Sequence, residues 1–160
     1  MCVFSFNLFN AVFMKKIKLF LLALLCMVLY PAMSFADDYT IPVDQLPANV
    51  KAFAQQYFPD LKIIYAEKDN DFSGNTYEIR LSDGTKIEFD RKGRWDKVDC
   101  NINAVPQALV PETIAAYVKA NFPDNVITKV DKERYGYEIE LSNDLELKFN
   151  KRGNLLRMDD

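Results

Sequence analysis

The sequence predicts an α+β fold of two tandem units, each a helix plus a four-stranded antiparallel sheet, with both helices on one sheet face. Three observations predict this fold. Residues 41–100 and 105–160 carry one pattern, which aligns without gaps over 77–95 and 137–155. Each unit opens with apolar residues at helical spacing between two prolines. Each then changes to strict alternation of apolar and charged residues, which is typical of a strand with one buried face.

The opening segment of each unit predicts a helix. Leu46, Val50 and Phe53 recur at spacings of four and three residues, which places them on one helical face. Pro47 suits the first helical turn, where its missing N–H is not needed, and Pro59 ends the helix. The second unit repeats this arrangement with Val110, Ile114, Tyr117, Val118 and Phe122 between Pro111 and Pro123.

Four strands are expected after each helix. Residues 61–67 and 126–131 are rich in β-branched side chains and predict the first strand of each unit. Residues 77–90 then alternate apolar with charged side chains on both sides of a turn, and the second unit repeats the alternation. The apolar side should pack against the helix while the charged side faces water. The predicted domains are residues 37–100 and 105–160, joined by the linker 101–104.

The length of the hairpin turn follows from the apolar pattern. A two-residue loop at Asp83-Gly84 would set Leu81 opposite Lys86 and break the apolar face, since opposed residues share a face. A three-residue loop over 82–84 sets Leu81 opposite Thr85 and keeps that face continuous. We therefore predict a type I turn with a G1 bulge and Gly84 in the left-handed region. Asp144 takes the place of this glycine in the second unit, at some conformational cost.

The next turn of each unit follows the same rule. Residues 91–93 and 151–153 both end in glycine and predict three-residue loops. Such a loop sets Trp95 beside Phe89, so we interpret Trp95 as a core residue and not as a binding-site aromatic.

Residues 1–36 predict a secretory signal peptide. Lysines after Met14 are followed by an apolar run of 12 residues, 19–30, and then by Ser34-Phe35-Ala36. The run is shorter than the roughly 20 residues that span a bilayer, although an uncleaved anchor is the alternative. We expect Met14 to be the start, residues 1–13 to be an upstream extension, and cleavage to follow Ala36. The mature protein should then be periplasmic or secreted, with no membrane span.

Composition narrows the function. Removal of three lysines with the signal peptide changes the net charge from −3 to −6, which argues against nucleic acid and anionic membrane as partners. The chain has no histidine, which excludes His-based triads and His metal sites, and we predict that it is not an enzyme. Cys100 is the one cysteine left after cleavage, and is either a buried small hydrophobe or a thiol that pairs between chains.

The chain resembles the PepSY-like, β-lactamase-inhibitor-like family of exported bacterial proteins. The resemblance covers about residues 41–160 and rests on FPD after each helix (122–124 in the second) and on the YEI hairpins that begin at Tyr77 and Tyr137. It implies a tandem helix-plus-four-strand fold and a role in binding or inhibiting a protein, as in PepSY propeptide modules and the β-lactamase inhibitor protein. This chain lacks that inhibitor's disulfide and matches none of its contact residues, so the resemblance does not carry over the inhibitor's target.

One segment suggests a metal. Residues 69–75 read D-x-D-x-S-G, with oxygen side chains of Asp69, Asp71 and Ser73 at positions 1, 3 and 5 of a calcium loop. The pattern fails at position 12, where Arg80 replaces the acid. The alternative is an ordinary polar hairpin loop, since Asp, Asn, Ser and Gly all favour turns. Calcium bound weakly at these three residues is the only cofactor that we consider.

The charged side of the predicted sheet is the second candidate site. We interpret it as a docking surface for a protein partner in the cell envelope, and plain solvation is the alternative. The leading hypothesis is therefore an exported, non-enzymatic binding module that inhibits or regulates an envelope protein. A calcium-responsive periplasmic protein is the alternative function. The partner and the oligomeric state do not follow from the sequence. The candidate docking residues are Glu78, Arg80, Lys86, Glu88, Glu138, Glu140, Glu146 and Lys148.

Overall fold

The computed structural model describes residues 39–71 and 74–159. The predicted signal peptide, with its start at Met14 and its cleavage after Ala36, lies outside the described residues. Within the described part, no helix is both long and apolar enough to cross a bilayer.

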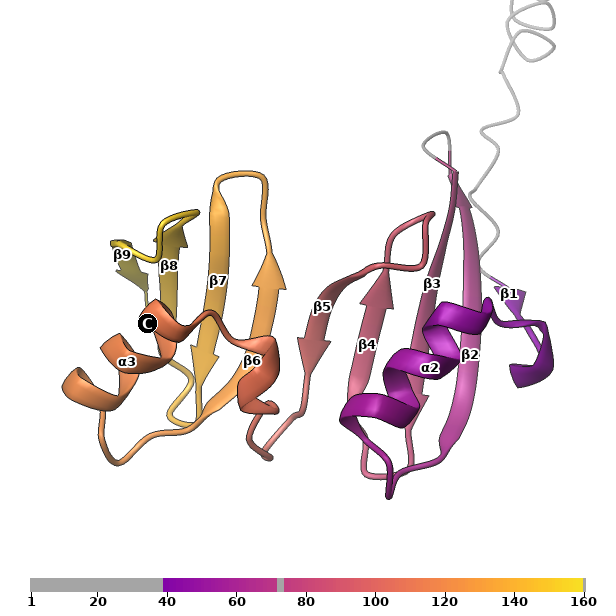
Figure 1. The fold of residues 1–160 in the computed structure, drawn as a ribbon, viewed down its shortest axis with the longest axis horizontal. Coiled ribbons are helices and arrows are strands. Elements are labelled where there is room, and N and C mark those ends of the chain that lie inside the picture. Colours follow the sequence, from indigo (N-terminus) through magenta and orange to yellow (C-terminus); the bar gives the residue numbers. More distant parts are fainter. Residues whose placement is uncertain (1–38, 72–73, 160) are drawn as a thin grey trace, which may run out of the picture. The chain divides into compact units, whose positions relative to one another are not determined.

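The strands form one antiparallel sheet in which they follow each other in chain order, from β1 to β9 (Figure 1). The class is α+β as predicted, but the strands do not separate into two four-stranded sheets, because β5 pairs with both β4 and β6. Strand β1 was not predicted. The strands are β1 Tyr39–Thr40, β2 Ile63–Asp71, β3 Gly74–Leu81, β4 Lys86–Phe89, β5 Trp95–Asp99, β6 Ile127–Lys132, β7 Gly136–Leu141, β8 Glu146–Asn150 and β9 Leu155–Asp159.

Two ten-residue helices, α2 (Ala48–Tyr57) and α3 (Glu112–Asn121), lie on one face of the sheet (Figure 1). Pro47 and Pro111 occupy the N-cap positions, one residue before the first helical turn in which the sequence predicts Pro47. A short 3₁₀ turn precedes each helix, η1 (Val43–Gln45) and η2 (Gln107–Leu109). The core between helices and sheet is built from the apolar positions of the alternating strands. Its fully buried members include Val50, Ile79, Leu81, Ile87, Phe89, Val98, Ile114, Val130, Ile139, Leu141, Leu147 and Phe149.

The predicted hairpin turns are confirmed. The Leu81 N–H donates to the Thr85 carbonyl at 2.8 Å, and Gly84 has a φ of +93°, so the loop has three residues and a left-handed glycine. Asp144 takes the same conformation with a φ of +65°. Phe89 lies opposite Tyr77, which keeps the apolar face continuous across the hairpin.

Trp95 packs at the margin of the core and not at its centre. It lies opposite Phe89, and its ring centroid is 6.1 Å from that of Phe53. Its other side carries the Lys132 ammonium, whose Nζ lies 3.1 Å from the indole centroid. Cys100, just beyond β5, is 1% exposed and so fits the prediction of a buried small hydrophobe.

The prediction that residues 69–75 form a loop is wrong. Asp69, Asn70 and Asp71 belong to β2, and they pair with residues 76, 75 and 74 of β3. The hairpin ladder therefore continues to the tip, and only residues 72–73 lie outside the described strands. Backbone pairing with a facing strand overrides the turn preference of these polar residues, since each pair satisfies backbone donors and acceptors.

Candidate functional site

The face of the sheet opposite the helices carries two rows of mostly charged side chains. Strand alternation and the observed register place one residue of each row on every strand from β2 to β9. We call this surface the charged sheet face. Its first row is Glu67, Glu78, Glu88, Lys97, Asp131, Glu138, Lys148 and Arg157, and its second row is Tyr65, Arg80, Lys86, Asp99, Lys129, Glu140, Glu146 and Asp159.

In the first half of this face, which spans β2 to β5, one lysine forms ion pairs with two carboxylates that lie opposite each other. Glu78 and Glu88 lie directly opposite each other on β3 and β4, an arrangement that repulsion alone would disfavour. The Lys86 Nζ lies 2.9 Å from Glu78 and 3.2 Å from Glu88. The hydrogen bond to Glu78 raises the pKa of Lys86, against the opposing effect of burial. The lysine therefore stays charged at neutral pH and fixes both acids.

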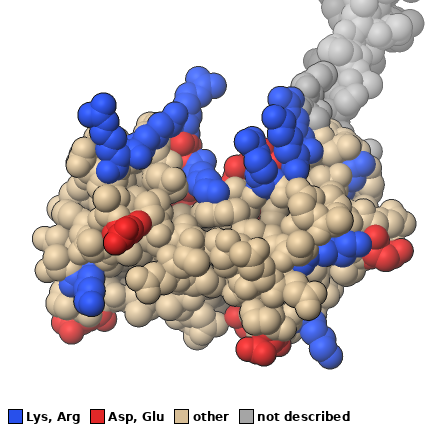
Figure 2. All heavy atoms as spheres, in the orientation of Figure 1, with Lys and Arg blue, Asp and Glu red and all other residues tan. Residues whose placement is uncertain are grey.

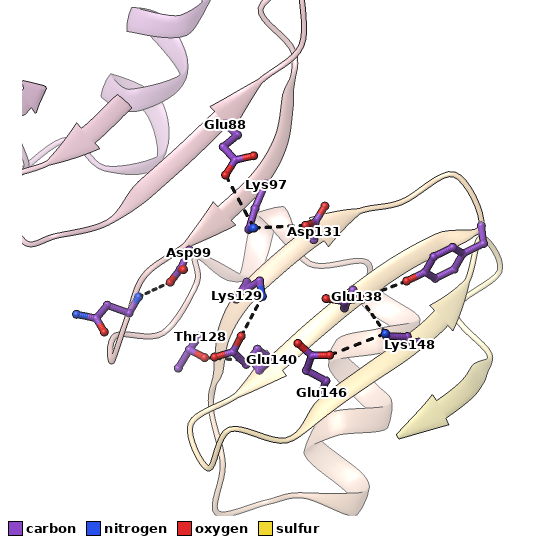
Figure 3. Close-up of polar contacts among 12 residues, drawn as sticks. Glu88, Lys97, Asp99, Thr128, Lys129, Asp131, Glu138, Glu140, Glu146 and Lys148 are labelled. Carbon is purple, nitrogen blue, oxygen red and sulfur yellow. Dashed lines mark hydrogen bonds and ion pairs between the residues drawn. The ribbon is translucent and has the colours of Figure 1, made fainter. Parts of the chain in front are cut away.

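At the centre of the face, Lys97 on β5 joins the two halves of the sheet. Its Nζ lies 3.9 Å from Glu88 on β4 and 3.7 Å from Asp131 on β6 (Figure 3). Burial raises the pKa of Asp131. Below Lys97, Lys129 of the second row lies 3.1 Å from Glu140 (Figure 3). Burial opposes the charge of Lys129, but its hydrogen bond with Glu140 leaves the pKa of the lysine raised.

In the second half, Lys148 is the central cation. Its Nζ contacts three carboxylates, Glu138 at 3.3 Å, Asp159 at 3.4 Å and Glu146 at 3.9 Å. The hydrogen bond with Glu138 raises the pKa of Lys148. Lys148 therefore orders the carboxylates around it, and an ordered set of charges suits recognition of a charged surface.

The structure brings all eight residues predicted for docking onto the charged sheet face. Sequence reasoning missed the members on the strands that flank the alternating hairpins, which are Tyr65, Glu67, Lys97, Asp99, Lys129, Asp131, Arg157 and Asp159. Those on β5 and β6 could have been found from the alternation of Lys97-Val98-Asp99 and Lys129-Val130-Asp131. The β5–β6 register, which makes the two alternating segments neighbours, could not be predicted from the sequence.

An acid-lined depression of about 280 Å³ opens on the first half of this face. Its carboxylates are Glu67, Asp69, Glu78, Glu88 and Asp96. The Asp69 Oδ1 is buried there and has no hydrogen-bond partner among the described residues. Burial also raises the pKa of Asp96, which stands at a bulge between β4 and β5. A depression with this lining favours a cation.

The three predicted calcium ligands are placed only in part. Asp69 lies in β2 and lines the depression, whereas Ser73 and the side chain of Asp71 lie outside the described part of the chain. Within that part, no group of three or more Asp, Glu, Cys or His residues is arranged to hold a metal ion. A calcium site at 69–75 stays a prediction.

The helix-bearing side differs from the charged sheet face. Figure 2, which views that side, shows a surface of mostly uncharged residues. Lys and Arg side chains gather above it, at the end of the sheet where the β4–β5, β6–β7 and β8–β9 turns lie (Figures 1 and 2). Ionic groups are therefore concentrated on the bare sheet face and at one end of the strands.

An antiparallel sheet with helices on one face and a bare, ion-paired opposite face defines the class as helix-on-sheet α+β proteins of the PepSY type. The family model described as "Putative beta-lactamase-inhibitor-like, PepSY-like" matches the chain twice, over residues 36–83 and 75–157, and the chain belongs to this family. The match with the family predicted from the sequence is thereby confirmed.

Solved structures of similar proteins agree with this assignment. A "putative periplasmic protein" of the DUF2874 family from Bacteroides vulgatus is 39% identical, and a "putative calcium-regulated periplasmic protein" from Bacteroides thetaiotaomicron is 40% identical. Each match has a TM-score of 0.73 and covers 78% of this chain and 98% of the other. A further periplasmic protein "of unknown function" from B. vulgatus is 32% identical, with a TM-score of 0.73 over 78% of this chain and 100% of the other. No curated protein matches the chain.

Proposed function

We propose that this protein is an exported, non-enzymatic binding module that docks an envelope protein through the charged sheet face and so inhibits or regulates it. The observation that carries the proposal is the set of ion pairs that spans each neighbouring strand pair from β3 to β9. Its cations are Lys86, Lys97, Lys129 and Lys148. Side chains fixed in this way lose little further entropy on binding, which favours a pre-organised surface. The periplasmic names of the similar structures support export, and the predicted signal peptide agrees with it.

The charge pattern indicates the kind of partner. Acids outnumber bases on the second half of the face, which spans β6 to β9. The acids are Asp131, Glu138, Glu140, Glu146 and Asp159, and the bases are Lys129, Lys148 and Arg157. A partner with a basic patch would be steered toward this half and selected by charge complementarity. Binding by such a partner should lose affinity as the salt concentration rises, since exposed charges are screened over about 10 Å at 0.1 M salt.

Affinity capture from the native envelope fraction tests the proposal with three baits. These are the wild type, the variant Glu138→Lys/Glu140→Lys/Glu146→Lys, and a control Asp60→Lys/Glu112→Lys/Asp124→Lys. The control has the same change in net charge at exposed residues beside the helices. We expect a partner that the wild type and the control both retain and the face variant loses, with the thermal unfolding of each bait recorded to confirm folding. Equal recovery by all three folded baits would exclude docking through this face.

Calcium binding is a second candidate function, favoured by the unpartnered Asp69 Oδ1 in the acid-lined depression. A carboxylate oxygen that is buried without a partner carries a cost that a bound cation would remove. The B. thetaiotaomicron protein named as calcium-regulated gives this candidate a relative at 40% identity.

Thermal unfolding with calcium and with magnesium tests this second candidate. A ligand that binds only the folded state raises the melting temperature. We expect calcium at millimolar concentration to raise the melting temperature of the wild type and of the control Asp60→Asn. The melting temperature of Asp69→Asn should not change. No rise for the wild type, or an equal rise for Asp69→Asn, would remove the Asp69 site from consideration.

A further inference from the structure

Strand β9 occupies in the second half of the sheet the position that β5 occupies in the first. Trp95 lies opposite Phe89 and Leu155 opposite Phe149, with a bulge at the same point of each pair. Val98 and Met158 likewise lie opposite buried residues of β4 and β8. The difference lies on the other side of the two strands, because β5 also pairs with β6 whereas β9 pairs only with β8 among the described strands.

The uncovered side of β9 exposes apolar side chains. Val98, which β6 covers, is fully buried, whereas the corresponding Met158 is 52% exposed and the nearby Leu156 is 58% exposed. A five-residue edge with free backbone groups is a template for another strand. The opposite edge of the sheet differs, since β1 has only two residues and offers little to pair with.

The β5–β6 pairing shows which side-chain pattern a strand needs in order to pair with an edge of this kind. Lys97, Val98 and Asp99 lie opposite Asp131, Val130 and Lys129 in turn, so a basic–apolar–acidic strand meets an acidic–apolar–basic one. On β9 the same order is Arg157, Met158 and Asp159. An antiparallel copy of β9 presents Asp159, Met158 and Arg157 to it. That is the acidic–apolar–basic pattern which β6 presents to β5.

We propose that β9 is a self-complementary docking edge at which a second copy of this chain adds its own β9 antiparallel, about a twofold axis at Met158. Arg157 of each copy then lies opposite Asp159 of the other. The registers centred one residue away set Arg157 opposite Arg157, or Asp159 opposite Asp159, and directly opposed like charges are destabilising. The register centred on Met158 is therefore favoured by electrostatics. It also sets the exposed Met158 of one copy opposite Met158 of the other.

Neighbouring charges within each copy favour the same arrangement. Arg157 lies beside Lys148, and Asp159 beside Glu146, so both rows of the charged sheet face end in like charges at β9. Within one copy, Asp159 already pairs across the two rows with Lys148 at 3.4 Å and with Arg157 at 2.7 Å. A second copy adds an opposite charge in line with each row. Because opposed residues of paired strands share a face, both copies keep their charged sheet faces on the same side. The pair therefore presents two docking faces side by side.

The backbone geometry fits this register. Cys100 donates its N–H to the Thr128 carbonyl, so by antiparallel alternation Val98 also bonds toward β6. The corresponding N–H and carbonyl of Met158 then point to the open side of β9. Three residue pairs join β5 to β6, and three described pairs would join the two copies, which indicates a small interface that forms and separates readily.

Sedimentation equilibrium of the exported chain over about 1 μM to 1 mM tests the proposal, because contacts of this size bind in that range. We expect the wild type to dimerise, and Arg157→Asp and Asp159→Arg each to raise the dissociation constant about tenfold or more, since each places like charges opposite each other twice. An equimolar mixture of the two variants, and the swap Arg157→Asp/Asp159→Arg, both restore the opposite pairs and should restore the dimer.

The restored pairs separate the proposal from general damage to β9. A variant that dimerises with its charge-reversed counterpart is folded, and a structural defect would not be repaired by mixing. Met158→Pro gives a second line of evidence and should fold but stay monomeric. Proline is tolerated at an edge position whose N–H faces solvent, but it cannot donate a hydrogen bond to a new strand. A wild type that stays monomeric at about 1 mM, or a dimer that survives both single reversals, would overturn the proposal.

Discussion

The two halves of the sheet share their registers and differ at single positions. Gly84 and Asp144 occupy the same left-handed turn position, Thr76 and Gly136 precede the corresponding tyrosines of β3 and β7, and Trp95 and Leu155 begin the corresponding strands. The backbone is nearly the same although these residues are not. Hydrophobic pairing across the strands therefore determines the fold, and the turn and margin residues adjust how much stability each half contributes.

The largest expected effect comes from the aromatic residue that anchors each half. Phe89 contacts Phe53 edge to face with centroids 5.4 Å apart, and Phe149 contacts Tyr117 in the same way at 5.4 Å. Both phenylalanines are buried, so Phe89→Ala and Phe149→Ala should each lower the free energy of unfolding by about 3–5 kcal/mol. Urea unfolding measures the loss.

The same experiment shows whether the halves are one cooperative unit. Since β5 and β6 pair directly and their buried valines Val98 and Val130 oppose each other, we expect each variant to unfold in a single transition. Two separate transitions in either variant would mean that one half stays folded without the other, against the continuous sheet.

The second comparison concerns Gly136. A Cβ at this position would lie 2.0 Å from the carbonyl oxygen of Phe149, because β7 and β8 pair here at Gly136 and Asn150. In the first half β4 ends at Phe89, and Thr76 takes the corresponding place. Gly136→Thr should therefore lower the free energy of unfolding by about 1–3 kcal/mol, whereas the reverse change Thr76→Gly should cost below about 1 kcal/mol. Equal effects of the two changes in thermal unfolding would contradict this account.

A smaller effect is expected at the hairpin turns. Asp144 holds a φ of +65°, which glycine adopts without strain, so Asp144→Gly should stabilise the protein by about 0.5–1 kcal/mol. Gly84→Asp should destabilise it by about 1 kcal/mol through backbone strain alone, since a Cβ there meets nothing within 4 Å. Melting temperatures that move in the same direction for both variants would show that contacts, and not φ, decide the difference.

The hairpins could be predicted from the sequence because strand alternation and turn length constrain each other. Leu81 opposite Thr85 is the one pairing that keeps the apolar face continuous, and the prolines at 47 and 111 mark the starts of the helices in the same local way. Strand β1 was missed because Tyr39-Thr40 is too short to show a period. The β2–β3 tip was interpreted as a loop because turn preference is local, whereas the pairing that overrides it depends on the facing strand.

The candidate site was only half predictable for a related reason. Glu78, Arg80 and their partners on the hairpins alternate within one segment of sequence, so their shared face could be inferred. Lys97 and Asp131 become neighbours only through the β5–β6 register, which joins segments more than 30 residues apart and leaves no local signal. The open edge of β9 likewise becomes visible only by comparison with the paired edge of β5.

The smallest expected effect compares two lysines that lie over aromatic rings at corresponding places. Lys132 lies opposite Tyr137 with its Nζ 3.1 Å from the Trp95 centroid, and Lys68 lies opposite Tyr77 with its Nζ 5.9 Å from the Tyr39 centroid. Burial lowers the pKa of Lys132 from 10.5 to about 8. The unfolded chain therefore holds this proton between about pH 8 and 10.5 while the folded chain has lost it, so this lysine makes stability rise with pH in that window.

Urea unfolding at about pH 7 and about pH 9.5 measures this contribution as the difference between the wild type and Lys132→Met. Lys132 is only partly buried, and after screening by solvent we expect the wild type to gain below about 1 kcal/mol relative to the variant between the two pH values. Burial raises the pKa of the Cys100 thiol to about 11, which lowers stability as pH rises above 9, but this contribution is common to both proteins and cancels in the difference. Lys68→Met is the matched control. Its free energy of unfolding is compared with that of the wild type at the same two pH values. If this difference changes with pH as much as the difference for Lys132→Met, close packing against Trp95 does not cause the lowered pKa of Lys132.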